Sequence, residues 1–284
     1  MEISNVWIRF PNGRAKALTL SYDDGVREDD RLIDIMQRYG LRGTFNLNTG
    51  RYLTEEQAEA AQKPYGIHKT EAQATQAYSG EGIEPAVHGY SHAFMGRLPL
   101  PQLTYEVLKD REALERQFGR VVRGLAYPYG SYSDSTVEVL RACGIAYART
   151  TQSTEKFDIP TDWLRMPATC HHNSARLSEL TERFVESQPK KNEHGWLFYL
   201  WGHSYEFARD DNWDVIEQFA ARIGGRDDVW YATNIEVYQY VESFRRLVFS
   251  LDCSRVENPS AQTVWFLYHS NVYSVAPGEV LELS

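Results

Sequence analysis

The 284-residue chain has little cysteine, no long apolar run and no excess of positive charge. Its three cysteines, Cys143, Cys170 and Cys253, form no Cys-x-x-Cys pair, which argues against a disulfide framework and against a thiolate metal site. No apolar stretch approaches the roughly 20 residues that a membrane-spanning helix needs. The opening MEISNVWIRFPNG lacks the basic start and apolar core of a signal peptide. We therefore expect a cytoplasmic protein with no membrane partner.

The charge and composition of the chain exclude further classes of protein and partner. The formal net charge of −9 implies no surface for a polyanion, so nucleic acid is not an expected partner. Hydrophobic residues make up 42% and charged residues 24%, as in an ordinary globular protein. The 18 tyrosines and 7 tryptophans suit a carbohydrate-binding cleft, but aromatic rings also fill protein cores.

Short apolar strands alternate with amphipathic helices over residues 1–246. After a strand at 17–22, the helix-spaced apolar residues Leu32, Ile35 and Met36 predict a helix over 28–39, and a strand follows at 43–48. Strand, helix and strand with short links form a parallel crossover unit. The alternation continues through strands 84–87, 121–126, 145–149, 196–202 and 228–232 and helices 101–118, 134–143, 213–223 and 233–246. This pattern predicts an α/β fold, most simply a barrel of parallel strands.

Residues 247–284 differ from the rest. Helical periodicity ends there, and TVWFLYHSNVYSVAPGEVLEL is typical of short strands joined by turns. We expect a small C-terminal β appendage on a barrel of residues 1–246. Its aromatic residues would suit a sugar-binding module, but so short a segment is marginal as an independent domain. A packing element or a contact in a homo-oligomer is the preferred interpretation.

Polar residues follow the ends of four predicted strands: Asp23 and Asp24, His88, Tyr127–Gly130, and His203. In a parallel barrel, catalytic groups lie at the carboxyl ends of the strands. Adjacent like charges repel, so the Asp pair indicates a site that needs negative charge. Asp29 and Asp30, in contrast, are explained by a helix N-terminus.

The string HGYSH places His88 and His92 four residues apart, a spacing that stacks two imidazoles on one face of a helical turn. Two histidines and one carboxylate make a common open metal site. The spacing alone arises often by chance, but together with the Asp pair it predicts a bound divalent ion. One Asp can ligate the ion while its neighbour handles a proton.

Four strings resemble motifs of the NodB-type polysaccharide deacetylases, carbohydrate esterase family 4. SYDDG resembles the family's T-F-D-D-G, and HGYSH resembles its H-[ST]-x-x-H, with Gly89 in the Ser/Thr position. LAYPYG and LWGH resemble two later motifs. The resemblance covers roughly residues 5–245 and implies a distorted (β/α) barrel of seven or eight strands.

The resemblance also implies roles in removing acetyl groups from an N-acetylated sugar, oligosaccharide or polysaccharide. Asp23 would be the general base and His203 the general acid, and the backbone N–H of Tyr129 would stabilise the oxyanion. Three residues would hold a divalent ion, most readily zinc, with cobalt, nickel or manganese as alternatives: Asp24, His88 and His92.

Two positions depart from the family's pattern. The third motif usually carries an Arg that orients the base, and Ala126 stands there; we expect Arg165, in DWLRMP, to supply the charge. The fourth motif usually supplies an acid that supports the acid His. DIPTDW offers Asp162 for that role, although a capping or surface acid fits as well.

Three further residues are weaker candidates for the pocket: His171, His172 and Arg149. Two other functions stay open. The chain could be a relative that hydrolyses a non-sugar amide such as a cyclic imide or ureide, or a non-catalytic carbohydrate-binding protein.

Overall fold

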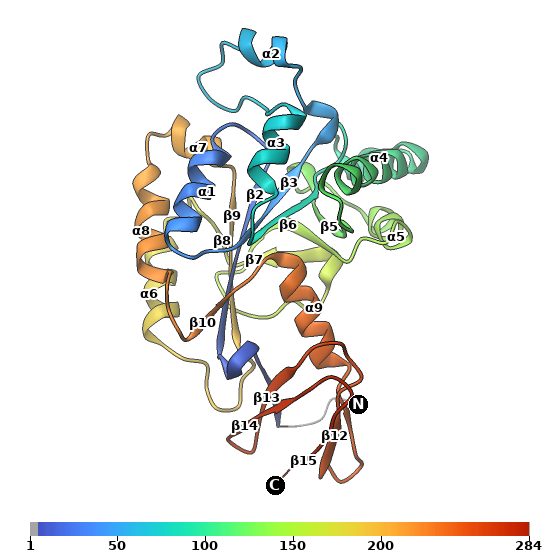
Figure 1. Ribbon diagram of the computed structural model, residues 1–284, viewed down its shortest axis with the longest axis vertical. Coiled ribbons are helices and arrows are strands. Elements are labelled where there is room, and N and C mark those ends of the chain that lie inside the picture. The colour runs from blue at the N-terminus through green and yellow to red at the C-terminus, as the bar shows by residue number, and fades with distance from the viewer. Residues whose placement is uncertain (1–4, 284) are drawn as a thin grey trace.

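A parallel sheet rolled into a distorted barrel forms the centre of the computed structural model, which describes residues 5–283 (Figure 1). Its strands run in the order β7-β6-β5-β4-β3-β2-β9-β8. Their bounds are β2 Lys16–Asp23, β3 Gly43–Leu47, β4 Ile83–Val87, β5 Gly124–Ala126, β6 Tyr147–Ser153, β7 Met166–Ala168, β8 Cys170–His171 and β9 Trp196–Gly202. The predicted α/β barrel is confirmed.

The barrel closes through a single irregular strand. Only Thr169 separates β7, which pairs with β6, from β8, which pairs with β9. The backbone N–H of Thr169 donates to the carbonyl of Tyr199 at 2.9 Å, which continues the ladder across the gap. A further strand, β10 (Val229–Tyr231), pairs with the first half of β2, and β3 pairs with the second half. Every residue of β2 is buried, as expected for a strand covered on both faces.

Helices lie around the outside of the strands (Figure 1). They are α1 Asp29–Arg38, α2 Glu55–Ala60, α3 Glu71–Tyr78, α4 Leu100–Phe118, α5 Asp134–Ala142, α6 Leu177–Glu186, α7 Ser204–Arg209, α8 Trp213–Ile223 and α9 Asn234–Arg245. Short 3-10 turns are η1 Pro11–Gly13, η2 Thr49–Arg51, η3 Met95–Arg97, η4 Pro128–Gly130 and η5 Trp163–Arg165. Within residues 5–283, none of the helices is both long and apolar enough to cross a bilayer.

Helix α1 shows why these segments are helical. Its apolar side chains Leu32, Ile35 and Met36 are fully buried, as their spacing predicts, and Gly40 follows the helix with a φ of 67°. The Asp29 and Asp30 pair occupies the first turn, where negative charge is favourable.

Two small antiparallel sheets lie at the end of the barrel where β2 begins, opposite α2 (Figure 1). One contains β1 Val6–Arg9, β13 Val264–Tyr268 and β14 Asn271–Val275, and the other contains β11 Val248–Phe249, β12 Arg255–Glu257 and β15 Val280–Glu282. The chain's first strand therefore pairs with its C-terminal segment. Phe266 is fully buried between the sheets, which favours a packing role; the domain boundary at residue 246 stays a prediction.

Candidate active site

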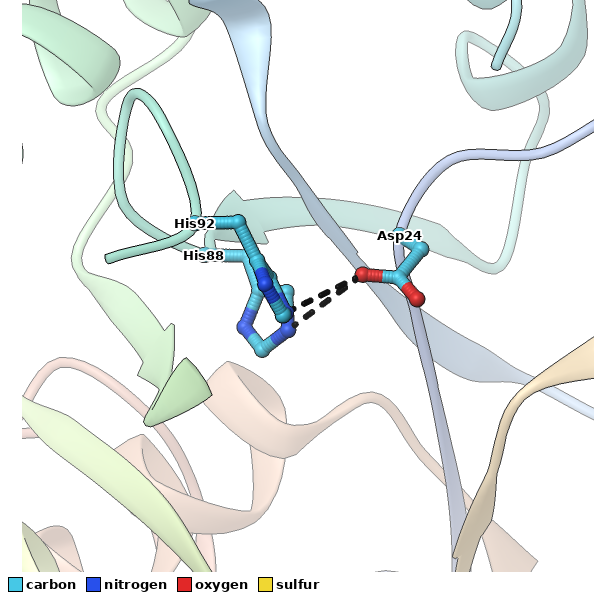
Figure 2. A group of neighbouring side chains, drawn as sticks. All are labelled: Asp24, His88 and His92. Carbon is cyan, nitrogen blue, oxygen red and sulfur yellow. Dashed lines mark ion pairs between the residues drawn. The ribbon is translucent and has the colours of Figure 1, made fainter. Parts of the chain in front are cut away.

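The two consecutive aspartates reach the same end of the barrel because the chain turns sharply between them. Asp23 ends β2, and Asp24 follows it with a φ of 82°, a left-handed conformation that is uncommon outside glycine. The turn brings the Asp24 carboxylate beside His88 and His92, which follow β4 (Figure 2). The left-handed turn thus places both acids at the carboxyl end of the barrel.

Asp24, His88 and His92 offer three ligand atoms that all lie within 4.8 Å of one another. Oδ1 of Asp24 is 3.3 Å from Nε2 of His92 and 3.7 Å from Nε2 of His88 (Figure 2). Neighbouring ligands of a tetrahedral zinc ion, bound at about 2.0–2.1 Å, lie about 3.3 Å apart. Among the described residues, this buried Oδ1 finds no hydrogen-bond partner, so the donor set suits a cation.

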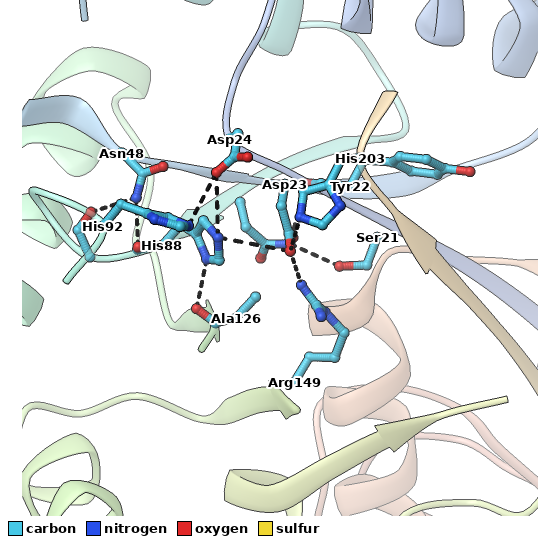
Figure 3. Close-up of polar contacts among 12 residues, drawn as sticks. Ser21, Tyr22, Asp23, Asp24, Asn48, His88, His92, Ala126, Arg149 and His203 are labelled. Carbon is cyan, nitrogen blue, oxygen red and sulfur yellow. Dashed lines mark hydrogen bonds and ion pairs between the residues drawn. The ribbon is translucent and has the colours of Figure 1, made fainter. Parts of the chain in front are cut away.

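The segment that carries both histidines is not a helical turn, so the predicted helical stacking is wrong. Gly89 and His92 both have positive φ values, 76° and 63°, which no helix allows. Instead, the side-chain amide of Asn48 donates to the carbonyls of His88 and Gly89 at 2.6 and 2.7 Å and holds the turn in place (Figure 3).

Hydrogen bonds from the barrel set the orientation of His88. Its Nδ1 donates to the carbonyl of Ala126 at 2.8 Å, and because a carbonyl only accepts, the lone pair stays on Nε2, which faces Asp24 (Figure 3). Burial lowers the pKa of His88, and burial, together with the repulsion that a protonated His88 would exert, lowers the pKa of His92 to about 4. Both rings are therefore neutral, as metal ligands must be.

Hydrogen-bond and ion-pair donors surround the carboxylate of Asp23. The guanidinium Nη2 of Arg149 forms an ion pair with its Oδ2, and Nδ2 of Asn46 donates to its Oδ1 at 2.8 Å (Figure 3). Burial alone would raise the pKa of Asp23, but the charges of Arg149 and of nearby histidines outweigh burial and hold this pKa well below its ordinary value. Asp23 is consequently ionised throughout the neutral range.

Arg149, and not Arg165, supplies the charge beside Asp23, so the expectation for Arg165 is wrong. Arg165 is a surface residue that pairs with Asp134 and Asp162, each at 2.7 Å. Arg149 is fully buried in β6, directly across the parallel ladder from Ala126. The positive charge that an Arg at position 126 would supply therefore comes from Arg149, on the neighbouring strand and at the same level of the barrel.

His203, directly after β9, faces Asp23 from the neighbouring strand end. Its Nε2 is 3.8 Å from Oδ2 of Asp23, and its Nδ1 is 3.4 Å from Oε2 of Glu206 in the first turn of α7. Burial acts to lower the pKa of His203, but the Glu206 and Asp23 carboxylates outweigh it and raise this pKa. The imidazolium form is thereby favoured.

Asp162 does not support His203, contrary to expectation. Its carboxylate caps the N–H of Leu164 at 3.0 Å and pairs with Arg165, which is the capping role that the sequence left open. Glu206 takes the place beside His203 instead. The three-residue spacing from His203 to Glu206 in one short helix is the signal that could have revealed it.

Tyr129 follows Pro128 in η4 with a φ of 56°. Its ring stacks on Phe94 with centroids 4.0 Å apart and meets His92 edge-on at 4.5 Å. Both Phe94 and Tyr129 are exposed, so an aromatic wall stands beside one metal-ligand candidate. The role of the Tyr129 backbone N–H stays a prediction.

The segment between β3 and β4 forms the opposite wall. Nδ1 of His68 donates to the carbonyl of Asp24 at 2.9 Å, and Gly66 lies against the ring of Tyr205 in α7. His171 and His172, at the end of β8, lie beyond His203, each with Nε2 3.2 Å from Oε2 of Glu206.

The sequence model of the polysaccharide deacetylase family matches residues 10–148. Among curated proteins, no relative matches the chain. A solved structure from Mycobacterium smegmatis, named as a candidate polysaccharide deacetylase, is 16% identical, with a TM-score of 0.59 over 86% of this chain and 96% of that one. This likeness supports the fold.

Two further solved structures are similar over parts of the chain. A Streptococcus pyogenes deacetylase in complex with acetate is 20% identical, with a TM-score of 0.40 over 47% of this chain and 55% of that one. A family 4 carbohydrate esterase from Streptomyces lividans, also in complex with acetate, is 18% identical, with a TM-score of 0.48 over 76% and 92%. The chain thus spans about half the length of the Streptococcus pyogenes protein.

Proposed function

Because this chain belongs to the polysaccharide deacetylase family, as its motifs predicted, we propose that it is a metal-dependent hydrolase that removes N-acetyl groups from an N-acetylated sugar, oligosaccharide or polysaccharide. Membership confirms the predicted enzyme class, a deacetylase-type hydrolase; the substrate, the metal and the residue roles belong to the proposal. One observation carries it: three ligand atoms converge at one strand end, with a charge-paired Asp beside them.

Asp24, His88 and His92 would hold the ion. When bound, a divalent cation polarises the acetyl carbonyl and lowers the pKa of a nearby water toward about 7. Two imidazoles and one carboxylate suit zinc best, and cobalt, nickel or manganese accept the same donors. The unpartnered Oδ1 of Asp24 supports this ligand set.

Asp23 would accept the proton of the attacking water. Its ion pair with Arg149 and its hydrogen bond from Asn46 fix the carboxylate and keep it charged. A carboxylate with so low a pKa is a weak base in bulk water, so its contribution depends on position within reach of the water. The N–H of Tyr129 would stabilise the negative charge on the acetyl oxygen.

His203 would protonate the departing amine as the C–N bond breaks, leaving acetate and a free amino group. This role requires the imidazolium form before the bond breaks, and the Glu206 and Asp23 carboxylates favour that form. In this proposal the general base and the general acid are neighbours, because Asp23 Oδ2 lies 3.8 Å from His203 Nε2.

A matched pair of variants tests the proposal. Asp23→Asn should keep the bound metal but lose acetate release by on the order of 10²–10⁴-fold, because only proton transfer is removed. His88→Ala should lose both metal and activity. Metal analysis and acetate release from chitooligosaccharides measure the two effects, with circular dichroism as the folding control.

The wild-type result separates the candidate functions. Metal binding with acetate release supports the proposal. Metal binding without acetate release from any N-acetylated sugar would contradict the proposal and favour hydrolysis of a non-sugar amide. A protein that neither binds metal nor releases acetate would instead be a carbohydrate-binding protein. Full activity in Asp23→Asn would remove Asp23 from the mechanism.

A further inference from the structure

We propose that Asp29 is a positioning residue of the candidate active site, and that its buried carboxyl group fixes the turn that carries Asp24 relative to the segment that carries His203. The hydrogen bonds that support this inference involve neither the side chains of the metal-ligand candidates nor those of the proposed acid and base. The effect on acetate release rests on the proposed function, whereas the effect on metal binding can be measured without substrate.

A helix N-terminus accounts for Asp30 but not for Asp29. Asp30 is exposed at the start of α1 and pairs with Lys69 at 2.7 Å. Asp29 is fully buried, and the three groups that donate to its carboxylate all lie outside α1. A buried carboxyl group costs stability unless hydrogen bonds satisfy it, so these three donors explain how the protein tolerates Asp29 there.

The three donors come from three different parts of the chain. The N–H of Val26, two residues after Asp24, donates to Oδ2 of Asp29 at 3.1 Å, and the hydroxyl of Tyr78, at the end of α3, donates to the same oxygen at 2.6 Å. The hydroxyl of Ser204, the first residue of α7, donates to Oδ1 at 2.5 Å. Helix α1 lies beside both α3 and α7, so one carboxyl group joins these helices to the turn after β2 (Figure 1).

At one end of this network, Asp29 holds the turn that places the Asp24 carboxylate. Asp24 and Gly25 have φ values of 82° and 66°, and Val26 follows this left-handed pair. A left-handed conformation at an aspartate is unfavourable and persists only where its surroundings hold it. The N–H of Lys69 also bonds the turn, at the carbonyl of Gly25, at 3.1 Å. Loss of Asp29 should therefore loosen the turn without unfolding it.

At the other end, Asp29 holds the start of α7. Ser204 is fully buried, and it lies between His203, the proposed acid, and Glu206. Oε2 of Glu206 is 3.4 Å from Nδ1 of His203, so both groups depend on where this short helix begins. A misplacement of about 1 Å can cost a catalytic group on the order of 10²-fold in rate. The bond from Ser204 to Asp29 therefore bears on proton donation.

The network does not need a full charge on Asp29. Burial raises the pKa of Asp29 to about 7, although its three hydrogen bonds act to lower it, so the neutral acid is present near neutral pH. A neutral carboxyl group can accept at Oδ2 and donate its own proton to the Ser204 oxygen. An asparagine reproduces this pattern with its carbonyl and its amide. Asp29→Asn is thus the conservative variant and Asp29→Ala the disruptive one.

Cobalt binding, measured by equilibrium dialysis, and acetate release at saturating cobalt test the inference on the same variants. Asp29→Ala removes all three bonds, so it should lose on the order of 10–100-fold in both cobalt affinity and kcat, as for other residues that hold a metal ligand in place. Ser204→Ala removes only the bond to α7, so kcat should fall while KM and the cobalt Kd stay at their wild-type values.

Two further variants complete the set. Asp29→Asn should recover most of the cobalt affinity and most of kcat, because it keeps the three hydrogen bonds at nearly constant volume. Asp34→Ala, on the exposed face of the same helix, is the matched control and should change neither constant. If Asp29→Ala does not fold by circular dichroism, the contrast between Ser204→Ala and Asp29→Asn still decides.

Wild-type constants in a folded Asp29→Ala would overturn the positioning role, as would an Asp29→Asn that is as impaired as Asp29→Ala. Equal losses of cobalt affinity and kcat in Ser204→Ala would show that the bond serves general stability instead. Wild type that binds cobalt but deacetylates no sugar would overturn the proposed function alone, because the cobalt affinities still test Asp29. Wild type that binds no cobalt would overturn both proposals.

Discussion

The β4 side and the β9 side of the candidate site differ in what orients their imidazole rings. On the β4 side, His88 donates to a main-chain carbonyl, and an asparagine amide holds the turn that carries His92. On the β9 side, His171, His172 and His203 share one carboxylate, that of Glu206. On the first side the groups that fix the rings are neutral, whereas the second side depends on a single charge. In the proposed mechanism the first side would hold the metal ion and the second would donate a proton, so the two roles would belong to different strands.

Replacement of Arg149 should have the largest effect on activity and stability, because Arg149 neutralises Asp23, which the histidines of both sides face. Arg149→Met leaves the buried Asp23 carboxylate without its charge partner, so the pKa of Asp23 should rise and acetate release should fall by on the order of 10²–10⁴-fold. Stability should also fall, by about 3–5 kcal/mol, as for a broken buried ion pair.

Steady-state kinetics and urea denaturation check both effects. Arg149→Lys, which keeps the positive charge, is the control and should recover part of each loss. Unchanged kinetics in a folded Arg149→Met would show that Asp23 needs no charge partner.

Glu206→Gln should have a smaller effect on activity, because it alters the β9 side alone. The Glu206 carboxylate raises the pKa of His203, so His203 stays protonated to higher pH in wild type. Without this charge the pKa of His203 falls, and the alkaline limb of the pH–rate profile should move to lower pH. Activity on that limb should drop on the order of tenfold, less than the 10²–10⁴-fold that complete loss of a positioned general acid costs.

The measurement is kcat against pH at one equivalent of metal. His88→Ala cannot serve as the control here because it removes the ion, but Glu182→Gln, on the exposed face of α6, can. An alkaline limb that stays in place would separate Glu206 from the protonation of His203.

Arg165→Ala should have the smallest effect. Arg165 makes two surface ion pairs, with Asp134 and Asp162, which contribute roughly 0–1 kcal/mol each. Acetate release should stay within about twofold of wild type, because surface changes remote from a site rarely alter it. A large loss of activity would return Arg165 to the role that the sequence suggested.

The sequence predicted those parts of the site that lie in contiguous strings. SYDDG, HGYSH and LWGH each place their polar residues directly after a strand, and parallel strands bring their carboxyl ends together, so Asp24, His88 and His203 could be found without coordinates. The roles assigned to them stay predictions until the variants are made.

Arg149 and Glu206 could not be assigned in this way. Arg149 belongs to no motif, and its nearness to Asp23 depends on the register that pairs it with Ala126, which no local pattern encodes. The three-residue spacing between His203 and Glu206 could have identified Glu206 as the acid beside His203. The resemblance to the family's fourth motif assigned that role to Asp162 instead. Helix α3 was not predicted, although Thr70 and Gln73 form a capping box there, as Thr233 and Glu236 do at the start of α9.

The pairing of β1 with β13 bears on how the protein is made. Val6 lies opposite Tyr268, so β1 has no partner until β13, on the far side of the barrel sequence, has been synthesised. The barrel strands can pair before β13 emerges, but the sheet that contains β1 cannot. The nascent chain therefore carries an apolar strand with open edges while the barrel is being made, a period in which chaperone binding would protect it from aggregation.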